Sequence, residues 1–190
     1  MKKKYNIKQT IEGCLKNEPL YQRSLVDQYS GMLLTICHRY LKSSEDARDG
    51  LQESLMRIFQ NLEKFDSRLA SFETWITTIT IRLCLTKLDK KQISIVSSDD
   101  LPYSHPSFEM EAELLDSYDA MYLTNMIAAL PDGYKSVFNL AAIDGYSHKE
   151  IAKLLDISVI TSRVRLNRAK KILMEKVLAL KTTEAWVNTI

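Results

Sequence analysis

The chain has 190 residues, which is enough for one domain or two small ones. Apolar residues make up 45% of it, so it can bury a core, and this excludes a wholly disordered chain. The formal net charge of +2 decides little, but the charges are unevenly placed. From Asp99 to Asp119 every charged residue is acidic, and from Arg163 to Lys171 every one is basic. Such a local basic stripe suits a polyanion partner at one face.

Several kinds of site and segment are excluded by what the sequence lacks. The three cysteines, Cys14, Cys37 and Cys84, show no Cys-x-x-Cys or Cys/His ligand spacing, so we predict no zinc site, no other metal and no cofactor. We interpret them as reduced core residues of a cytoplasmic protein. The first residues lack the apolar region of a signal peptide, and no run reaches the length of a membrane span. We therefore expect no direct membrane insertion.

Long apolar-periodic stretches with few glycines and prolines favour helices over strands. A first helical block runs from about residue 18 to 91. Its first helix follows Pro19, a second begins at Ser44 and a third at Ser71, each with apolar residues at helical spacing. No internal repeat is visible.

The stretch QISIVSSDDLPYSHPSFEM has two prolines and no steady period, and we interpret it as a linker. Its ISIV segment could form a short strand, although nothing nearby offers a partner. A second helical block follows, with a helix over about 111–129, a break at Leu130-Pro131 and a helix that ends at Gly145. The predicted fold class is all-α, with two small helical domains (1–91 and 110–190) joined by a linker (92–109).

The segment SHKEIAKLLDISVITSRVRLNRAK predicts two helices joined by a short turn. Ser147 and Glu150 form an S-x-x-E capping box, and Ser158 can cap a second helix after the break. A buried seam on that second helix is formed by Leu166, Ala169, Leu173 and Val177. This pattern, with a basic face on the second helix, matches a helix-turn-helix whose second helix enters the major groove. Periodicity alone leaves open a helical hairpin with a solvated basic face.

The same region, LPDGYKSVFNLAAIDGYSHKEIAKLLDISVITSRVRLNRAKKIL, resembles region four of bacterial sigma factors of the extracytoplasmic-function type. The similarity lies in Leu-Pro at 130–131, Gly-Tyr-Ser at 145–147 and Glu-Ile-Ala at 150–152. The earlier stretch SSEDARDGLQESLMRIFQNLEKFDSRLASFETWITTI resembles region two of the same family, through Gln52-Glu53 and Trp75-Ile76. Two motif sets in the right order, over roughly 20–91 and 110–178, indicate a member of the sigma-70 family.

A few positions depart from the family pattern. Asp156 stands where the helix-turn-helix turn usually has glycine, and Val164 where the recognition helix often has serine. In region two, Arg82 and Asp89 replace a usual asparagine and arginine. Aspartate tolerates a left-handed backbone better than most residues, so we expect the turn to survive at modest cost.

The resemblance implies a transcription initiation factor that binds core RNA polymerase, directs it to specific promoters and assists promoter melting. It also implies an anti-sigma factor as partner, no chemistry of its own and no small-molecule substrate. In the family, the helix that here begins at Ser44 docks on the polymerase. Its matching polar face carries Asp46, Asp49, Gln52, Glu53, Met56 and Arg57.

That helix face has two other interpretations. Without the resemblance, a solvated helix face is the simpler one. The carboxylates of Asp46, Asp49 and Glu53 could also hold magnesium, as in a nuclease. No catalytic partner or phosphate-binding loop accompanies them, which argues against this second interpretation.

The resemblance also implies two groups of DNA-binding residues. For the minus-ten element they are Arg68, Ser71 and Phe72 in the loop that receives a flipped base, with Arg82 and Lys87 along the phosphate backbone. For the minus-thirty-five element they are Lys149, Thr161, Ser162, Arg163, Arg165 and Arg168. An inward orientation of Ser162, one turn before Leu166, stays open.

Two competing functions remain at this point. The chain could be a helix-turn-helix regulator that binds DNA without polymerase, and only the likeness to region two argues against that. It could also be a degenerate sigma-like protein that titrates polymerase or an anti-sigma factor. The departures at Asp156, Arg82 and Asp89 motivate this second alternative.

Overall fold

The computed structural model describes residues 6–88 and 120–187, and every regular element among these residues is helical. The expected all-α fold is confirmed. The chain divides into two compact units, Met1–Leu88 and Asp89–Ile190. The predicted linker, with its possible strand, lies outside the described residues. So does the first part of the helix predicted over about 111–129, while Ala120–Ala128 is helical as expected. The domain boundaries at 91 and 110 therefore stay predictions.

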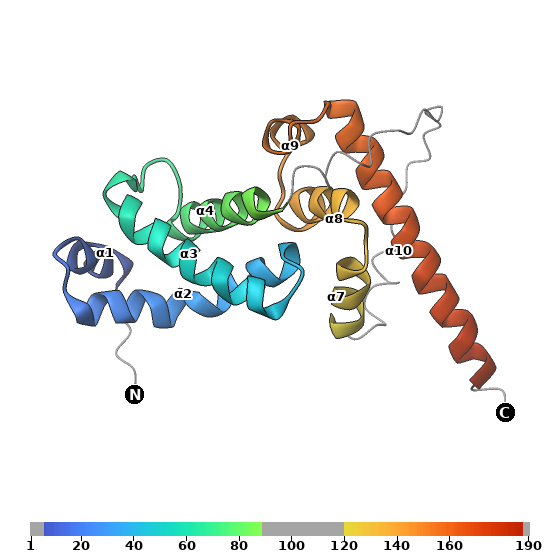
Figure 1. Cartoon of the computed structure of the whole chain (residues 1–190), viewed down its shortest axis with the longest axis horizontal. Coiled ribbons are helices and arrows are strands. Elements are labelled where there is room, and N and C mark those ends of the chain that lie inside the picture. Colours follow the sequence, from blue (N-terminus) through green and yellow to red (C-terminus); the bar gives the residue numbers. More distant parts are fainter. Residues whose placement is uncertain (1–5, 89–119, 188–190) are drawn as a thin grey trace. The chain divides into compact units, whose positions relative to one another are not determined.

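Unit 1 is a helical bundle built around one long helix (Figure 1). Its elements are α1 (Ile7–Leu15), α2 (Pro19–Tyr40), α3 (Ser44–Asn61), the short 3-10 helix η1 (Leu62–Lys64) and α4 (Phe72–Lys87). Helix α2 packs against α1, α3 and α4, and α3 also packs against α4. The three helices predicted from the sequence are therefore the ones that build the core.

The helix starts follow from local side-chain chemistry. Pro19 occupies the first turn of α2, where its missing N–H is no loss. The Ser43 hydroxyl accepts a hydrogen bond from the Asp46 backbone N–H at 3.0 Å and caps α3. In the same way the Ser71 hydroxyl accepts from Thr74 N–H at 3.1 Å and caps α4. These starts agree with the sequence expectations to within one residue.

Helix α1 is an addition to the predicted elements. The Asn6 side chain caps it by accepting a hydrogen bond from Lys8 N–H at 3.1 Å. The connection to α2 passes through Asn17, whose φ of 57° is left-handed. Gly13 is buried where α1 meets α2. Glycine fits this position because any side chain there would overlap Tyr21.

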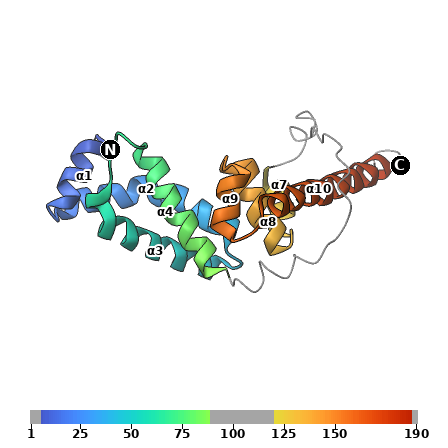
Figure 2. The same cartoon turned by 90° about the horizontal axis from the view of Figure 1, so that it is seen from above.

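Unit 2 is organised along α10 (Val159–Val187). The other elements are α7 (Ala120–Ala128), α8 (Asp132–Phe138), the π-helical stretch η3 (Asn139–Ile143) and α9 (His148–Leu155). Helices α7, α8 and α9 all pack on α10, which extends beyond them as a rod (Figures 1 and 2). The break at Leu130-Pro131 is confirmed, and Gly145, with φ 74°, follows the end of η3.

The core of unit 2 includes the seam expected on its last helix. Ala169, Leu173 and Val177 of α10 pack with Met126, Leu130 and Phe138 from α7, the break and α8. Leu166 is only partly buried at the edge of this cluster. The seam therefore faces α7 and α8, and this orientation decides which basic residues of α10 remain outside.

We predict that Gly13→Ala destabilises unit 1. The added Cβ would lie 2.8 Å from the Tyr21 Cβ and would overlap its ring. Overpacking of this kind costs about 1–3 kcal/mol. The gain from replacing glycine within a helix is smaller, roughly 0.5–1 kcal/mol. Urea unfolding followed by circular dichroism measures the difference.

Gly31→Ala is the matched control for this substitution. Gly31 lies within α2, and a Cβ added there has nothing within 4 Å. We expect this variant to gain up to about 1 kcal/mol from helix propensity alone. Shifts of the same sign in the two variants would contradict the close approach of α1 to α2.

Candidate nucleic-acid interface

Helices α9 and α10 form the predicted helix-turn-helix. The capping box is present, because Glu150 accepts a hydrogen bond from Ser147 N–H at 2.8 Å while the Ser147 hydroxyl caps Glu150 N–H. Asp156 ends α9 in the left-handed region, with φ 54° and ψ 48°. The Ser158 hydroxyl then accepts from Thr161 N–H at 2.9 Å at the start of α10. The departure at Asp156 therefore leaves the turn intact.

A side-chain contact joins the two helices of this motif. His148 Nδ1 and the Ser162 hydroxyl lie 2.9 Å apart in a hydrogen bond between α9 and α10. Burial lowers the pKa of His148, and the charges of Arg163 and Lys170 lower it further. The neutral imidazole is thus favoured. Ser162 is fully buried, so its assignment to DNA is wrong for this structure, and its role is to hold α9 against α10.

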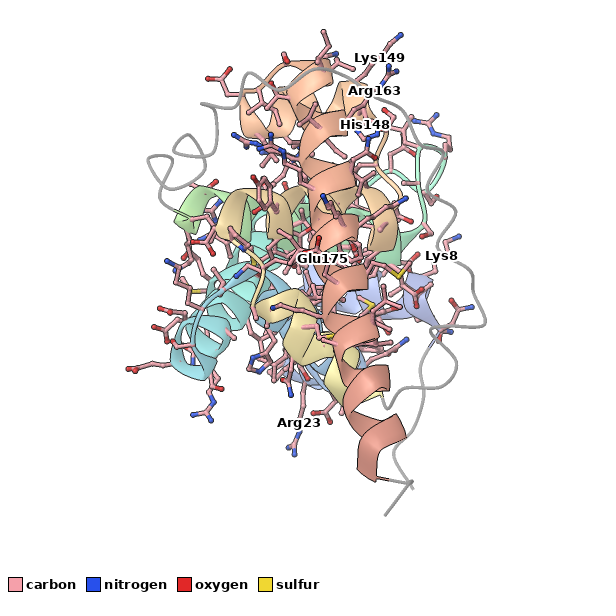
Figure 3. All side chains as sticks on the ribbon, turned by 90° about the vertical axis from the view of Figure 1, so that its right-hand side faces the viewer. Lys8, Arg23, His148, Lys149, Arg163 and Glu175 are labelled. Carbon is pink, nitrogen blue, oxygen red and sulfur yellow. The ribbon has the colours of Figure 1, made fainter. Side chains whose placement is uncertain are left out.

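One side of α10 is fully exposed near its start. Residues three or four positions apart form a stripe there, which we call the α10 stripe: Ile160, Arg163, Asn167 and Lys171. Ile160 is 64% exposed, which is unusual for a large apolar side chain. Thr161 and Arg168 flank the stripe and are half-buried. Lys149 of α9 is also exposed and lies at the same end of unit 2 as Arg163, next to His148 (Figure 3).

Sequence reasoning found only part of this stripe. It included Arg163 but missed Ile160, Asn167 and Lys171. The signal was available, because positions opposite the Ala169 and Leu173 seam recur every three or four residues from Arg163. The prediction instead selected the arginines for their charge. It therefore omitted Ile160 and Asn167, which carry no charge, and Lys171, which lies beyond the last arginine.

Arg165 is the main correction to the predicted site. It is 1% exposed, and none of its three guanidinium nitrogens has a hydrogen-bond partner. The reason is its position, three residues after Ser162 and four before Ala169, on the buried side of α10. Burial lowers the pKa of this guanidinium. In this structure Arg165 is therefore not available to DNA.

Arg168 has a partner on a neighbouring helix. It donates a hydrogen bond to the Tyr134 hydroxyl of α8 at 3.2 Å. Arg168 is therefore half-buried beside the seam and is not free in solvent. This contact holds Arg168 at the edge of the α10 stripe.

In unit 1 the polar face of α3 comes together as expected. Asp46, Asp49 and Gln52 are exposed, and Met56 is 60% exposed. Glu53 accepts a hydrogen bond from Arg57 at 2.7 Å, one turn further along. The face thus combines carboxylates with one bare apolar side chain. Such a mixture suits a dissociable interface with another protein.

Lys87 joins this α3 face instead of standing apart on α4. Its Nζ lies 2.8 Å from the Glu53 carboxylate. The hydrogen bond to Glu53 raises the pKa of Lys87, and the charges of Asp49 and Asp46 raise it further. Its assignment to the DNA backbone stays a prediction, because Lys87 is exposed although it is paired with Glu53 of the acidic face. Arg82 of α4 is exposed, as expected.

The loop between η1 and α4 carries two exposed candidates, Arg68 and Ser71, and the first residue of α4, Phe72, is a buried one. Arg68 is exposed and pairs with Asp66, with Nη2 and Oδ2 2.6 Å apart. Phe72 is only 5% exposed. Its ring packs against those of Tyr29, Phe65 and Trp75 at 5.2–5.8 Å between centroids. It is a core residue, and its assignment as a base contact is wrong for this structure.

The exposed apolar side chain of this loop is Leu69, at 85%. Sequence analysis missed it, because a lone leucine between polar residues carries no periodic signal. Ser71 is exposed, and its hydroxyl is engaged in capping α4.

Among residues 6–88 and 120–187, no group of three or more histidine, cysteine, aspartate or glutamate side chains is placed to hold a metal ion. Within the same residues, no helix combines the length and the apolar character needed to cross a membrane.

We predict that Arg165→Met stabilises unit 2. An unpaired buried charge is costly, and an apolar side chain of similar length removes that cost while keeping the packing. The expected gain in free energy of unfolding is about 1 kcal/mol or more. Arg163→Met on the exposed stripe is the matched control and should change stability by less than about 0.5 kcal/mol. Loss of stability in Arg165→Met, measured by thermal unfolding, would contradict this view of the site.

Comparison with known proteins agrees with this geometry. Residues 25–93 match the model of sigma-70 region 2, and residues 120–173 match that of sigma-70 region 4. These ranges contain the α3 face and the helix-turn-helix.

Relatives match over almost the whole chain. The ECF RNA polymerase sigma factor SigW of Bacillus subtilis (strain 168) is 26% identical over 181 residues, covering 90% of this chain and 96% of its own. The ECF RNA polymerase sigma-E factor of Haemophilus influenzae is 26% identical over 166 residues, covering 82% and 87%. The sigma factor RpoE from Bartonella quintana, solved with the anti-sigma factor NepR, has a similar fold, with a TM-score of 0.52, 16% identity and coverage of 83% and 96%. The chain belongs to the sigma-70 family, as a sigma factor of the extracytoplasmic-function type.

Proposed function

We propose that the chain is a transcription initiation factor that binds core RNA polymerase, directs it to specific promoters and assists their melting. The observation that carries this proposal is the presence, in one chain, of a helix-turn-helix with an exposed basic stripe and a separate unit with an exposed polar α3 face. A regulator that binds DNA without polymerase requires the helix-turn-helix, but it does not require the polar α3 face as a surface for polymerase. The order of the region 2 and region 4 matches supports the same function.

For the minus-thirty-five element we propose contacts from the exposed side of the helix-turn-helix. Arg163 and Lys149 supply charge for phosphates or guanine edges, and Thr161 and Arg168 flank them. Asn167 adds a side chain able to bind adenine with two hydrogen bonds. The exposed methyl groups of Ile160 suit contact with a thymine methyl group.

For the polymerase we propose the α3 face, and for the minus-ten element the loop before α4. The polymerase-binding residues are Asp46, Asp49, Gln52, Glu53, Met56 and Arg57, with Lys87 added. The minus-ten contacts are Arg68, Ser71 and Arg82, with Leu69 as the exposed apolar group that could meet an unstacked base.

The proposal includes partners and a location. Two solved structures of similar fold are complexes, one of RpoE with the anti-sigma factor NepR and one of CnrH with the cytosolic domain of CnrY. We infer that this chain too is held by an anti-sigma factor and acts in the cytoplasm. It catalyses no reaction in transcription and needs no cofactor for this function, since it acts by positioning polymerase and DNA.

Transcription from a defined promoter tests the function. Sequencing of transcripts induced by overexpression supplies candidate promoters, which are then transcribed in vitro with core polymerase from the source bacterium. We expect a discrete start site only when the chain is added. Binding to the promoter without any effect on initiation would favour a regulator independent of polymerase. Inhibition of other sigma factors without a new start site would favour a titrating protein.

We predict that Arg163→Ala weakens binding of the resulting holoenzyme to such a promoter. Loss of an exposed arginine that contacts DNA costs about 1–3 kcal/mol. If the contact is to a phosphate, the slope of log affinity against log salt also falls by about 0.9. Fluorescence anisotropy at several salt concentrations measures both quantities.

Two substitutions with the same loss of charge serve as controls. Arg23→Ala removes an exposed arginine of α2 that belongs to neither proposed DNA face. Arg165→Met removes a guanidinium that is hidden within unit 2. We expect both to leave the salt slope unchanged. A reduced slope in either variant would mean that net charge, rather than the α10 stripe, governs binding.

A further inference from the structure

Two thiols from different helices meet in the core of unit 1. Cys37 of α2 and Cys84 of α4 have their sulfur atoms 3.9 Å apart, and Cys84 donates a hydrogen bond to Cys37. Both are free and fully buried. We propose that this pair is a reversible redox site, which a hydroperoxide closes to a disulfide and a small thiol reopens. The inference does not depend on the proposed transcription function.

The place of the two cysteines favours access by a small oxidant. Cys37 lies three residues before the end of α2 at Tyr40, and Cys84 lies three residues before the end of α4 at Lys87. Terminal helical turns open locally far more often than a domain unfolds. A peroxide molecule can therefore reach the sulfur atoms without loss of the fold.

The third helix of unit 1 approaches the thiol pair closely. Gly50 of α3 faces Cys37, and a Cβ at that position would lie 3.3 Å from the Cys37 sulfur. A larger residue would press on the thiol from the third helix. Closing the bridge requires the sulfur atoms to approach from 3.9 Å to about 2.05 Å. This movement, of about 2 Å, is within the reach of side-chain rotation and small helix shifts.

The two thiols are chemically unequal. The hydrogen bond from Cys84 lowers the pKa of Cys37, and the Lys87 charge lowers it further against the effect of burial. The pKa of Cys84 is raised, first by that same hydrogen bond and then by burial. Because Cys84 donates the hydrogen bond and Cys37 accepts it, Cys37 is the attacking thiolate and Cys84 the thiol that resolves the intermediate.

The reaction balances with a hydroperoxide as the oxidant. The Cys37 thiolate attacks one peroxide oxygen, the O–O bond breaks, and the leaving oxygen takes a proton to become water or an alcohol. Cys37 is then a sulfenic acid. The Cys84 sulfur attacks the Cys37 sulfur, the S–O bond breaks, and water leaves with the Cys84 proton. The two electrons given up by the thiols reduce the peroxide, and thiol exchange reverses the oxidation.

The third cysteine provides an internal control. Cys14 of α1 is also buried, but burial raises its pKa to about 11, and its thiol takes no part in the contact between Cys37 and Cys84. Low thiolate character and the lack of a resolving thiol make it slow to oxidise. Selectivity between these three thiols therefore separates a built redox site from general oxidation.

The first test uses the unmodified full-length chain. It is treated under native conditions with hydrogen peroxide, alkylated and digested, and the peptides are analysed by mass spectrometry. We expect a peptide cross-linked through Cys37 and Cys84, with Cys14 still alkylated, and recovery of all three thiols after treatment with dithiothreitol. Pairing that involves Cys14, or oxidation without the Cys37–Cys84 cross-link, overturns the proposal.

Single substitutions test the order of the steps. In Cys84→Ala, Cys37 should stop at the sulfenic acid and be labelled by a 1,3-dione. In Cys37→Ala, Cys84 should remain unlabelled. Cys14→Ala should form the cross-link at the rate of the unmodified chain. Equal labelling of the first two variants, or labelling of neither, overturns the assignment of Cys37 as attacking thiolate, and the peptide analysis of the unmodified chain stands even if a variant unfolds.

Discussion

The packing of α10 on α7 and α8 through Ala169 and Leu173 fixes the rotation of this helix about its axis. A helix with one side held in a core has its opposite side turned to solvent. Arg163 is exposed for this reason, and Arg165, two residues later, is hidden for the same reason. The capping box and the His148 hydrogen bond then hold α9 in place beside it. The surface offered to DNA thus follows from an apolar contact.

In unit 1, α4 has the role that α10 has in unit 2, because its packing orients the residues of the proposed binding surfaces. Phe72 begins it within a group of aromatic rings, and Cys84 and Lys87 end it against α2 and α3. The ion pair between Lys87 and Glu53 connects α4 to the polar face of α3. The same helix that follows the proposed minus-ten loop therefore also orients a residue of the proposed polymerase face. Binding at one of these surfaces acts on a helix shared with the other.

Features that depend on neighbouring residues could be predicted from the sequence, and features that depend on distant ones could not. The starts of α3 and α4 follow from capping by Ser43 and Ser71, the start of α2 follows from the fixed backbone of Pro19, and the all-α fold follows from periodicity. The burial of Arg165 depends on helices far away in the chain, and sequence spacing placed this residue on the wrong side of its helix. The assignment of Phe72 to a flipped base came from the family resemblance and not from spacing. Helix α1 is nine residues long, too short for a periodic pattern to stand out.

The continuity of α10 has a consequence for how this protein can change its length. Each residue inserted into a helix rotates everything beyond it by about 100°. An insertion or deletion between Arg163 and Leu173 would turn the exposed stripe out of phase with the seam that anchors it. Substitution is therefore the open route to a different DNA preference within this stretch, while gains and losses of residues are better tolerated beyond Val177, the last residue of the seam.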